Sequence, residues 1–196
     1  MTKITTDRKI GLFAPSGYGK THLAKALLKR IADSGITVYI YDTDYEYSQD
    51  KVFIDHVNII IHSPILKDLH SLRHLNNYLK VIRTNSKNAF VYIVDLDLFY
   101  DKASSNSFDN SELKLIASAG RHQRLGLIYE AKQTAFIPTK LISNTNLFYI
   151  GQFSTPTDMK KLSNIVSTEE FAQLDRAKHE FWEVDALYNT KRKVII

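Results

Sequence analysis

The stretch "APSGYGKT", which begins at Ala14, has the spacing of a loop that binds phosphate. It fits the pattern G-x-x-x-x-G-K-[ST], except that alanine stands at the first glycine position. A loop that wraps a polyphosphate points successive backbone N–H groups inward, and Gly17 and Gly19 supply the backbone freedom that this requires. Lys20 would then reach the β- and γ-phosphates, and the Thr21 hydroxyl would ligate Mg²⁺. The pattern therefore predicts a site for ATP and Mg²⁺.

We expect the nucleotide to contact the whole loop and the residue that follows it. These residues are Ala14, Pro15, Ser16, Gly17, Tyr18, Gly19, Lys20, Thr21 and His22. A helix that begins at Lys20 would add the positive end of its dipole to the site. Ala14 is compatible with such a loop when its φ is negative, which its place at the end of a strand favours.

A carboxylate at the end of a second apolar run is expected to complete the site. Asp95 follows "FVYIV", where an unpaired carboxylate would be costly, so we expect it to face the same Mg²⁺ as the loop. Hydrolysis also needs a base that polarises the attacking water. The residue directly after Asp95, where a glutamate would be expected, is Leu96. Asp97 is the nearest candidate base, and Glu46 and Glu130 are its rivals.

Short apolar runs alternate with amphipathic, helix-like stretches along the chain, and these must position the candidate residues. The predicted strands cover residues 9–15, 36–42, 56–62, 89–97, 125–131 and 146–153. The predicted helices cover residues 21–35, 63–84, 111–123, 155–166 and 167–177. Residues 179–196 are expected to form a hairpin that turns near Asn189, with the run "KRK" at 191–193 as a solvated turn.

Side-chain caps are expected at several helix starts. Ser63 with Pro64 suits the start of the second helix, and Ser111 suits the third. Ser167 and Glu170 have the spacing of a capping box.

The alternation of strands and helices predicts an α/β fold of the P-loop NTPase type. We expect a three-layer sandwich with a mostly parallel central sheet, helices on both faces and a C-terminal β-hairpin. The 196 residues are expected to form a single domain, 1–196. In such sheets ligands bind at the edge formed by the carboxyl ends of the strands, where the loop would lie.

Composition narrows the class of protein. The chain has no cysteine, which excludes disulfides and thiolate zinc sites. No stretch approaches the roughly 18 apolar residues of a membrane span, so we expect a cytoplasmic protein with no membrane segment. The net charge of +5 permits a nucleic-acid partner without requiring one.

The segment "AGRHQRLGLIYEAKQTAFIP", together with the phosphate loop, resembles ATPases of the HerA/FtsK type. The compact length and the terminal hairpin are closest to the genome-packaging ATPases of tailless icosahedral viruses, including archaeal ones. The likeness is strong at 14–21, moderate at 91–97 and 120–166, and faint elsewhere. It implies an oligomeric ring, hexameric or pentameric, that hydrolyses ATP to move double-stranded DNA, with capsid proteins as possible partners.

The resemblance also implies roles for residues outside the loop. Arg121 matches an arginine that points into the neighbouring subunit's active site, and Arg124 is the alternative. The family's sensor glutamine falls at Lys132 without a gap and at Gln133 with one inserted residue. We favour Gln133, because an amide can donate to the γ-phosphate and accept from the water.

The sequence leaves open where DNA would be contacted and which reaction the nucleotide site would support. The loop at 99–111, which contains Lys102, is the candidate for a sequence-independent grip on DNA. A second hypothesis is a small P-loop kinase, although the chain lacks the dense arginine cluster that a lid over the phosphate donor would need. A nucleotide-binding switch with little hydrolysis is a third, because no glutamate stands at position 96.

Overall fold

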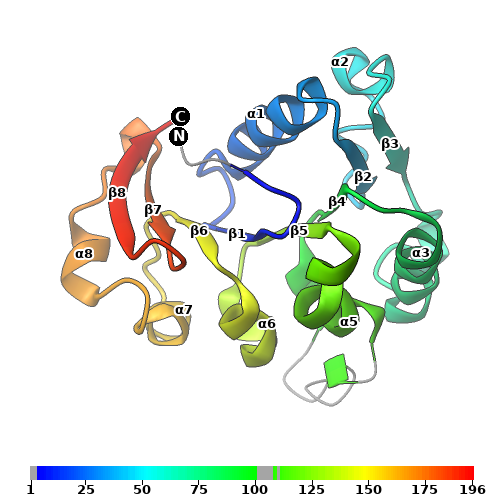
Figure 1. Ribbon diagram of the computed structural model, residues 1–196. Helices are drawn as coiled ribbons and strands as arrows, with labels where there is room; N and C mark the ends of the chain where they lie inside the picture. Colours follow the sequence, from blue (N-terminus) through cyan, green and yellow to red (C-terminus); the bar gives the residue numbers. More distant parts are fainter. Residues whose placement is uncertain (1–3, 101–107, 110) are drawn as a thin grey trace.

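The computed structural model describes residues 4–100, 108–109 and 111–196, and one eight-stranded sheet forms its centre (Figure 1). The strand order is β3-β2-β4-β5-β1-β6-β7-β8. All neighbours from β3 to β6 pair in parallel, and β7 and β8 add antiparallel strands at one edge. The strands are β1 Lys9–Phe13, β2 Thr37–Tyr41, β3 Ile59–His62, β4 Ala89–Ile93, β5 Leu125–Ala131, β6 Leu147–Ile150, β7 Glu180–Asp185 and β8 Thr190–Ile195.

Helices and short 3₁₀ turns connect these strands. The helices are α1 Lys20–Asp33, α2 Lys51–Ile54, α3 Leu72–Asn85, α5 Glu112–Ala119, α6 Thr139–Asn144, α7 Pro156–Leu162 and α8 Thr168–Ala172. The 3₁₀ turns are η1 Leu66–Asp68, η2 Leu96–Phe99, η3 Gly120–Gln123, η4 Thr134–Phe136 and η5 Arg176–Lys178. None of the helices in the described part of the chain combines the length and apolarity needed to cross a bilayer.

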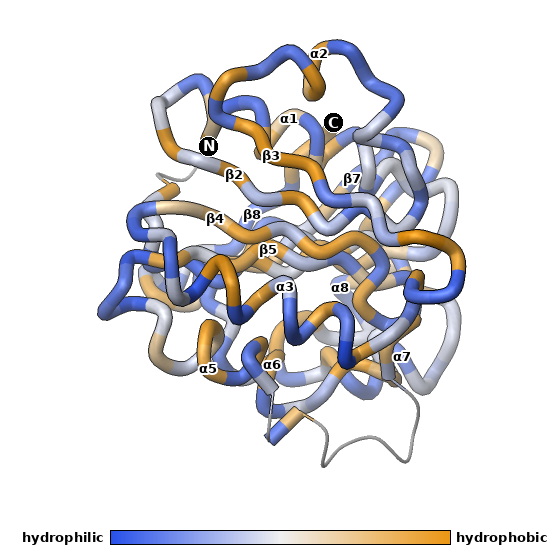
Figure 2. Tube along the Cα trace, turned by 90° about the vertical axis from the view of Figure 1, so that its right-hand side faces the viewer, coloured by the Kyte–Doolittle hydropathy of each residue, from blue (hydrophilic) through white to orange (hydrophobic). Residues whose placement is uncertain are grey.

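Helices cover both faces of the sheet, which confirms the predicted three-layer architecture. Helix α1 packs on one face, and α3, α5 and α6 pack on the other (Figures 1 and 2). Strands β1, β4 and β5 are buried along their whole length, as expected for parallel strands covered on both sides. The C-terminal hairpin is also confirmed, and it turns at Asn189, whose φ is 50°.

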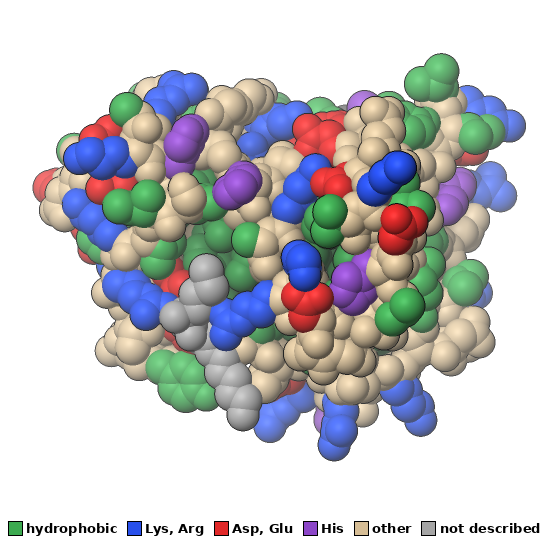
Figure 3. Space-filling model, turned by 90° about the horizontal axis from the view of Figure 1, so that it is seen from above, with side chains coloured by type: hydrophobic (Ala, Val, Ile, Leu, Met, Phe, Trp, Pro, Cys, Tyr) green, Lys and Arg blue, Asp and Glu red, His purple; other side chains and the backbone are tan. Residues whose placement is uncertain are grey.

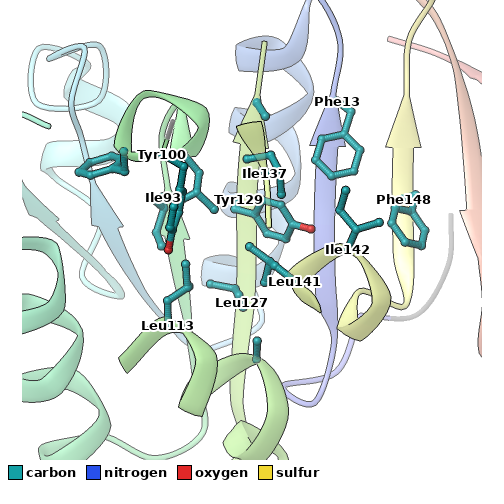
Figure 4. Packing of buried hydrophobic residues seen from close by; sticks show 14 of the residues in the cluster. Phe13, Ile93, Tyr100, Leu113, Leu127, Tyr129, Ile137, Leu141, Ile142 and Phe148 are labelled. Carbon is teal, nitrogen blue, oxygen red and sulfur yellow. The ribbon is translucent and has the colours of Figure 1, made fainter. Parts of the chain in front are cut away.

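Aromatic side chains from three adjacent strands fill the layer beneath the sheet (Figure 4). The ring of Phe13 in β1 lies 5.6 Å from that of Tyr129 in β5 and 6.2 Å from that of Phe148 in β6. Leu141 and Ile142 of α6 belong to the same buried cluster as these three rings. Residues 139–144, which the sequence analysis left unassigned, become helical because this apolar face accepts Leu141 and Ile142.

The predicted helix over residues 63–84 begins later than expected. The Ser71 hydroxyl accepts a hydrogen bond from the His74 N–H and caps α3, which begins at Leu72. The Ser63 hydroxyl instead donates to Asp42 at 3.5 Å, so the predicted cap at Ser63 is wrong. The Ser63 side chain therefore binds Asp42, which follows β2, and does not cap a helix.

The basic run at 191–193 lies in strand β8 rather than in a turn. Lys191 pairs with Glu170, and Arg192 pairs with Glu183 at 2.6 Å. Lys193 donates to the backbone carbonyl of Gln173 at 2.7 Å. These charges therefore tie the edge strand to α8, to the residue that follows α8 and to strand β7.

A buried ion pair ties the start of the chain to the hairpin. Arg8 and Asp185 are 2% and 1% exposed, and their Nη1 and Oδ1 atoms are 2.9 Å apart. The same Asp185 oxygen accepts the N–H groups of Leu187 and Tyr188, which shapes the hairpin turn. Arg8 also lies over the ring of Tyr188, 5.2 Å from its centroid. The Asp185 carboxylate thus binds both the segment before β1 and the turn after β7.

Replacing Arg8 by methionine should strongly lower the free energy of unfolding. The loss would leave the Asp185 carboxylate buried without its cation, which costs about 3–5 kcal/mol. Urea unfolding followed by circular dichroism measures the change. Lys29→Met, which breaks an exposed ion pair with Asp33, is the control and should change stability little. Equal stability of Arg8→Met and wild type would contradict this assignment.

Candidate nucleotide-binding site

The phosphate loop lies between β1 and α1, at the carboxyl edge of the sheet. Gly17 and Gly19 have φ values of 72° and 94°, in the left-handed region that the predicted loop requires. Ala14 is buried and is not among the residues with positive φ, so its side chain is accommodated as expected. Thr21 and His22 lie in the first turn of α1, with His22 exposed.

Tyr18 fastens the loop to the C-terminal part of the sheet. Its side chain is fully buried, and its hydroxyl donates to the Glu180 carbonyl at 2.7 Å. Its ring meets Phe181 edge-on at 5.0 Å. A Cβ atom at Gly151 would lie 2.6 Å from the Tyr18 ring, so only glycine fits there. The side chain of Tyr18 therefore supports the loop from behind, while the backbone remains available to a ligand.

Lys20 is 5% exposed and its ammonium donates to the Pro15 carbonyl at 3.3 Å. Burial lowers the pKa of Lys20, and the nearby carboxylates of Glu130 and Asp95 oppose that shift. A buried ammonium that folds back over its own loop lies where the phosphates of a nucleotide would place negative charge.

Asp95 follows β4 and is fully buried, with φ at 44°. Its Oδ2 atom lies 2.5 Å from the Nζ of Lys132, and that Nζ lies 3.6 Å from Asp44, which follows β2. Burial raises the pKa of Asp95 to about 6, and the hydrogen bond from Lys132 opposes the rise. Two strands thus bring two carboxylates to one ammonium.

The donor set at Asp95 fits a Mg²⁺ ion. Its Oδ1 atom is buried and has no hydrogen-bond partner among the described residues. Mg²⁺ prefers carboxylate and hydroxyl oxygens and commonly uses one or two carboxylates together with phosphates. Thr21 lines the same cavity as Asp44, so its hydroxyl is available on the phosphate side.

Asp97 holds the segment after β5 in place. Its Oδ1 and Oδ2 atoms accept the backbone N–H groups of Lys132 and Gln133, at 3.2 and 2.9 Å. Burial raises the pKa of Asp97, and these two hydrogen bonds oppose the rise. Both carboxylate oxygens are therefore engaged with the backbone of the neighbouring loop.

Glu130 lies in β5, between β1 and β4, and is 3% exposed. Strand alternation turns it to the face of α1, away from Tyr129, and its Cα pairs with that of Leu12. Its Oε2 atom has no hydrogen-bond partner within the part of the chain that the structure describes. Burial raises the pKa of Glu130 to about 7; Asp95 adds to the rise, and Lys20 opposes it.

Lys20, Glu130 and Lys132 line one cavity of about 410 Å³, which is large enough for a small-molecule ligand. Its lining residues are Ser16, Gly17, Gly19, Lys20, Thr21, Asp44, Glu46, Glu130, Lys132 and His179. A second cavity of about 470 Å³ adjoins it and shares Ser16 and Lys132. Gln133, the predicted sensor, is exposed and lines this second cavity, whereas Lys132 lines both.

Arg121 and Arg124 lie at the opposite edge of the sheet. Arg121 is in η3, and Arg124 comes directly before β5, whereas Lys132 follows the other end of that strand. Strand β5 spans about 20 Å at roughly 3.3 Å per residue. Both arginines are exposed and line a cavity of about 320 Å³ with Asn88. They are not in the site of their own chain.

Asp44 and His179 also line the phosphate-loop cavity, although the sequence pattern does not single them out. Asp44 could have been found, because it follows a predicted strand as Asp95 does, and the carboxyl ends of parallel strands share one edge. His179 gives no such signal, since its place depends on how the C-terminal segment packs against the loop.

Comparison with known proteins gives the family. The family model for the central domain of the helicase HerA matches residues 5–189, nearly the whole chain. The chain belongs to this HerA family. The resemblance to HerA/FtsK-type ATPases predicted from the sequence is therefore confirmed. A search of curated protein sequences gave no match.

Solved structures agree with the HerA-family fold. The genome packaging NTPase B204 from Sulfolobus turreted icosahedral virus 2, in complex with ATP-gammaS, has a TM-score of 0.77 at 14% identity. The alignment covers 97% of this chain and 98% of B204. The pCW3 conjugation coupling protein TcpA has a TM-score of 0.68 at 15% identity, over 99% of this chain and 62% of TcpA. The type VII secretion ATPase EccC of Thermomonospora curvata has a TM-score of 0.65 at 10% identity, over 97% of this chain and 25% of EccC.

Replacing Asp97 by alanine should destabilise the fold by about 1–3 kcal/mol, because two backbone N–H groups would lose their acceptor. Asp97→Asn should cost less, since its amide retains one carbonyl acceptor. Chemical denaturation measures both. A variant Asp97→Ala with wild-type stability but no turnover would instead support Asp97 as the base.

Proposed function

We propose that this HerA-family chain binds ATP with Mg²⁺ and hydrolyses it to move double-stranded DNA. The observation that carries the proposal is the grouping of a buried lysine and two buried carboxylates at the phosphate loop. Lys20 and Glu130 line its cavity, and Asp95 pairs with Lys132, which lines it too. Lys20 comes from α1, Asp95 from the end of β4 and Glu130 from β5. Phosphoryl transfer needs this combination of positive charge, metal ligand and base.

Each group has a separate role in the proposed reaction. The loop N–H groups and Lys20 bind and orient the β- and γ-phosphates. Asp95 and Thr21 would hold Mg²⁺, which neutralises charge that develops on the transferred phosphoryl group. Lys132, next to Asp95, adds a second ammonium on the side where the γ-phosphate is expected.

Glu130 is the base that the site supports best. Asp97 has both oxygens bound to backbone N–H groups, and Glu46 is exposed at the mouth of the cavity. One buried oxygen of Glu130 instead has no hydrogen-bond partner among the described residues, and a pKa near 7 suits a general base at neutral pH. Glu130 would polarise the attacking water, which Leu96 cannot do.

We propose that the active form is an oligomer in which one subunit completes the site of the next. Arg121 or Arg124 would act in trans, because about 20 Å of strand separates them from their own phosphate loop. An arginine supplied by a neighbour stabilises the charge of the transferring phosphoryl group. The fold shared with B204 supports viral genome packaging, and capsid proteins would be partners in that role.

DNA contact would be sequence-independent and distributed over the assembly. The chain has a net charge of +5, and the face in Figure 3 carries basic side chains interspersed with acidic and apolar ones. The predicted contact at Lys102 lies outside the described residues. Backbone contacts of this type weaken as salt is added.

Turnover of ATP with Mg²⁺ should rise when double-stranded DNA is added, and removal of the metal with EDTA should stop it. Lys20→Ala should lower turnover at least about 100-fold, because the phosphates lose their buried cation. Phosphate release, measured with and without DNA, tests both statements. Tight ATP binding with background turnover would favour a nucleotide switch, and phosphate transfer to a small acceptor would favour a kinase.

Glu130→Gln should lower kcat by about 100-fold or more while ATP still binds, because the amide cannot accept the proton of the water. Single-turnover kinetics and nucleotide titration separate the two effects. Glu112→Gln, on α5 away from the cavity, is the matched control. Full activity of Glu130→Gln, together with loss of activity in Glu46→Gln, would move the base to Glu46.

A further inference from the structure

The turn at residues 175–180 lies against the phosphate loop. The His179 Nδ1 atom is 3.1 Å from the Tyr18 carbonyl, and the Arg176 guanidinium donates to the Ser16 carbonyl at 3.4 Å. A Cβ atom at Gly19 would lie 3.3 Å from the imidazole, so the ring packs closely on the loop backbone. This contact brings a residue from the C-terminal part of the chain to the predicted ligand.

His179 has a fixed position in this turn. Its φ is 50°, and its ring meets that of Tyr18 edge-on at 6.5 Å. A carbonyl oxygen can only accept, so Nδ1 must carry the proton of this hydrogen bond. The turn is closed by hydrogen bonds between Asp175 and Glu180, at 2.9 and 3.2 Å. The imidazole is therefore positioned before any ligand binds, while the residue itself is exposed.

The order of groups around the cavity sets the direction of a bound nucleotide. Glu130 and Lys132 line the cavity from the side of β5, and Lys132 pairs with Asp95 after β4. The γ-phosphate must point toward these groups if hydrolysis takes place there. His179 lines the same cavity next to the loop glycines and comes from the segment before β7, on the other side of β1. The nucleoside must extend away from the γ-phosphate, and therefore toward His179.

We infer that the turn at 175–180 forms the nucleoside side of the site, with the His179 ring packed against the base of the bound nucleotide. The inference rests on the proposed binding of a nucleoside triphosphate by the phosphate loop. Stacking of a base on an aromatic side chain strengthens binding by about tenfold and accepts any flat base. His179 thus supplies affinity for the nucleoside, and the loop supplies affinity for the phosphates.

The test compares ATP with inorganic tripolyphosphate, which has the phosphates without the nucleoside. His179→Asn is the main variant, because asparagine tolerates positive φ and can still donate to the Tyr18 carbonyl but has no ring. In calorimetry with Mg²⁺, this variant should bind ATP about tenfold more weakly and tripolyphosphate within twofold of wild type. Lys178→Ala, in the same turn but outside the cavity lining, should leave both affinities unchanged.

Two results would overturn the inference. Unchanged ATP affinity in His179→Asn would show that the ring does not contact the nucleoside. Equal losses for ATP and tripolyphosphate would show that His179 only positions the loop. Failure of wild type to bind either ligand would instead refute the proposed nucleotide site itself.

A measurement on the wild-type protein covers the case in which the variant does not fold. The imidazole Hε1 resonance of His179 should shift when ATP is added and should shift much less with tripolyphosphate. An equal shift with both ligands would contradict a base contact.

Discussion

The parallel pairing of β1, β5 and β4 is the constraint on which the site depends. Parallel strands end at the same edge, so the phosphate loop after β1, Glu130 near the end of β5 and Asp95 after β4 meet there although they are far apart in the chain. The sheet order also separates this edge from Arg124 by the length of one strand. The proposed role of Arg121 or Arg124 is therefore one in the site of a neighbouring subunit.

Charge balance inside the cavity follows from this geometry. Asp95 and Glu130 are buried carboxylates, and each faces ammonium groups rather than water. Burial alone would favour their neutral forms, and Lys20 and Lys132 oppose that effect. The HerA-family chain lacks a glutamate after Asp95, yet a carboxylate from the adjacent strand lies on the same side as Lys20. The proposed base, Glu130, therefore comes from the strand next to the one that Asp95 follows.

The C-terminal hairpin supports the phosphate loop as well as closing the sheet. Tyr18 packs its buried ring on Phe181, and Arg8 pairs with Asp185 at the other end of β7. Both contacts join the first strand region to the last part of the chain. A loop that binds phosphate through its backbone must be held rigid by its side chains, and here the hairpin provides the surface against which they pack.

Local patterns in the chain predict the layers, the phosphate loop and two of the helix caps, because these depend on periodicity and on hydrogen bonds between near neighbours. Apolar runs predicted β1, β4 and β5, and local spacing predicted the caps at Ser111 and Ser167. The partner of each polar side chain depends on the packing of the whole chain. Asp97 binds backbone N–H groups of a distant loop, Ser63 turns to the end of β2, and the basic run of β8 pairs with acids. The partners of Asp97 and Ser63 follow strands that are adjacent in the sheet and separate in the chain, and Lys191 of β8 pairs with Glu170 of α8, so no local pattern encodes these contacts.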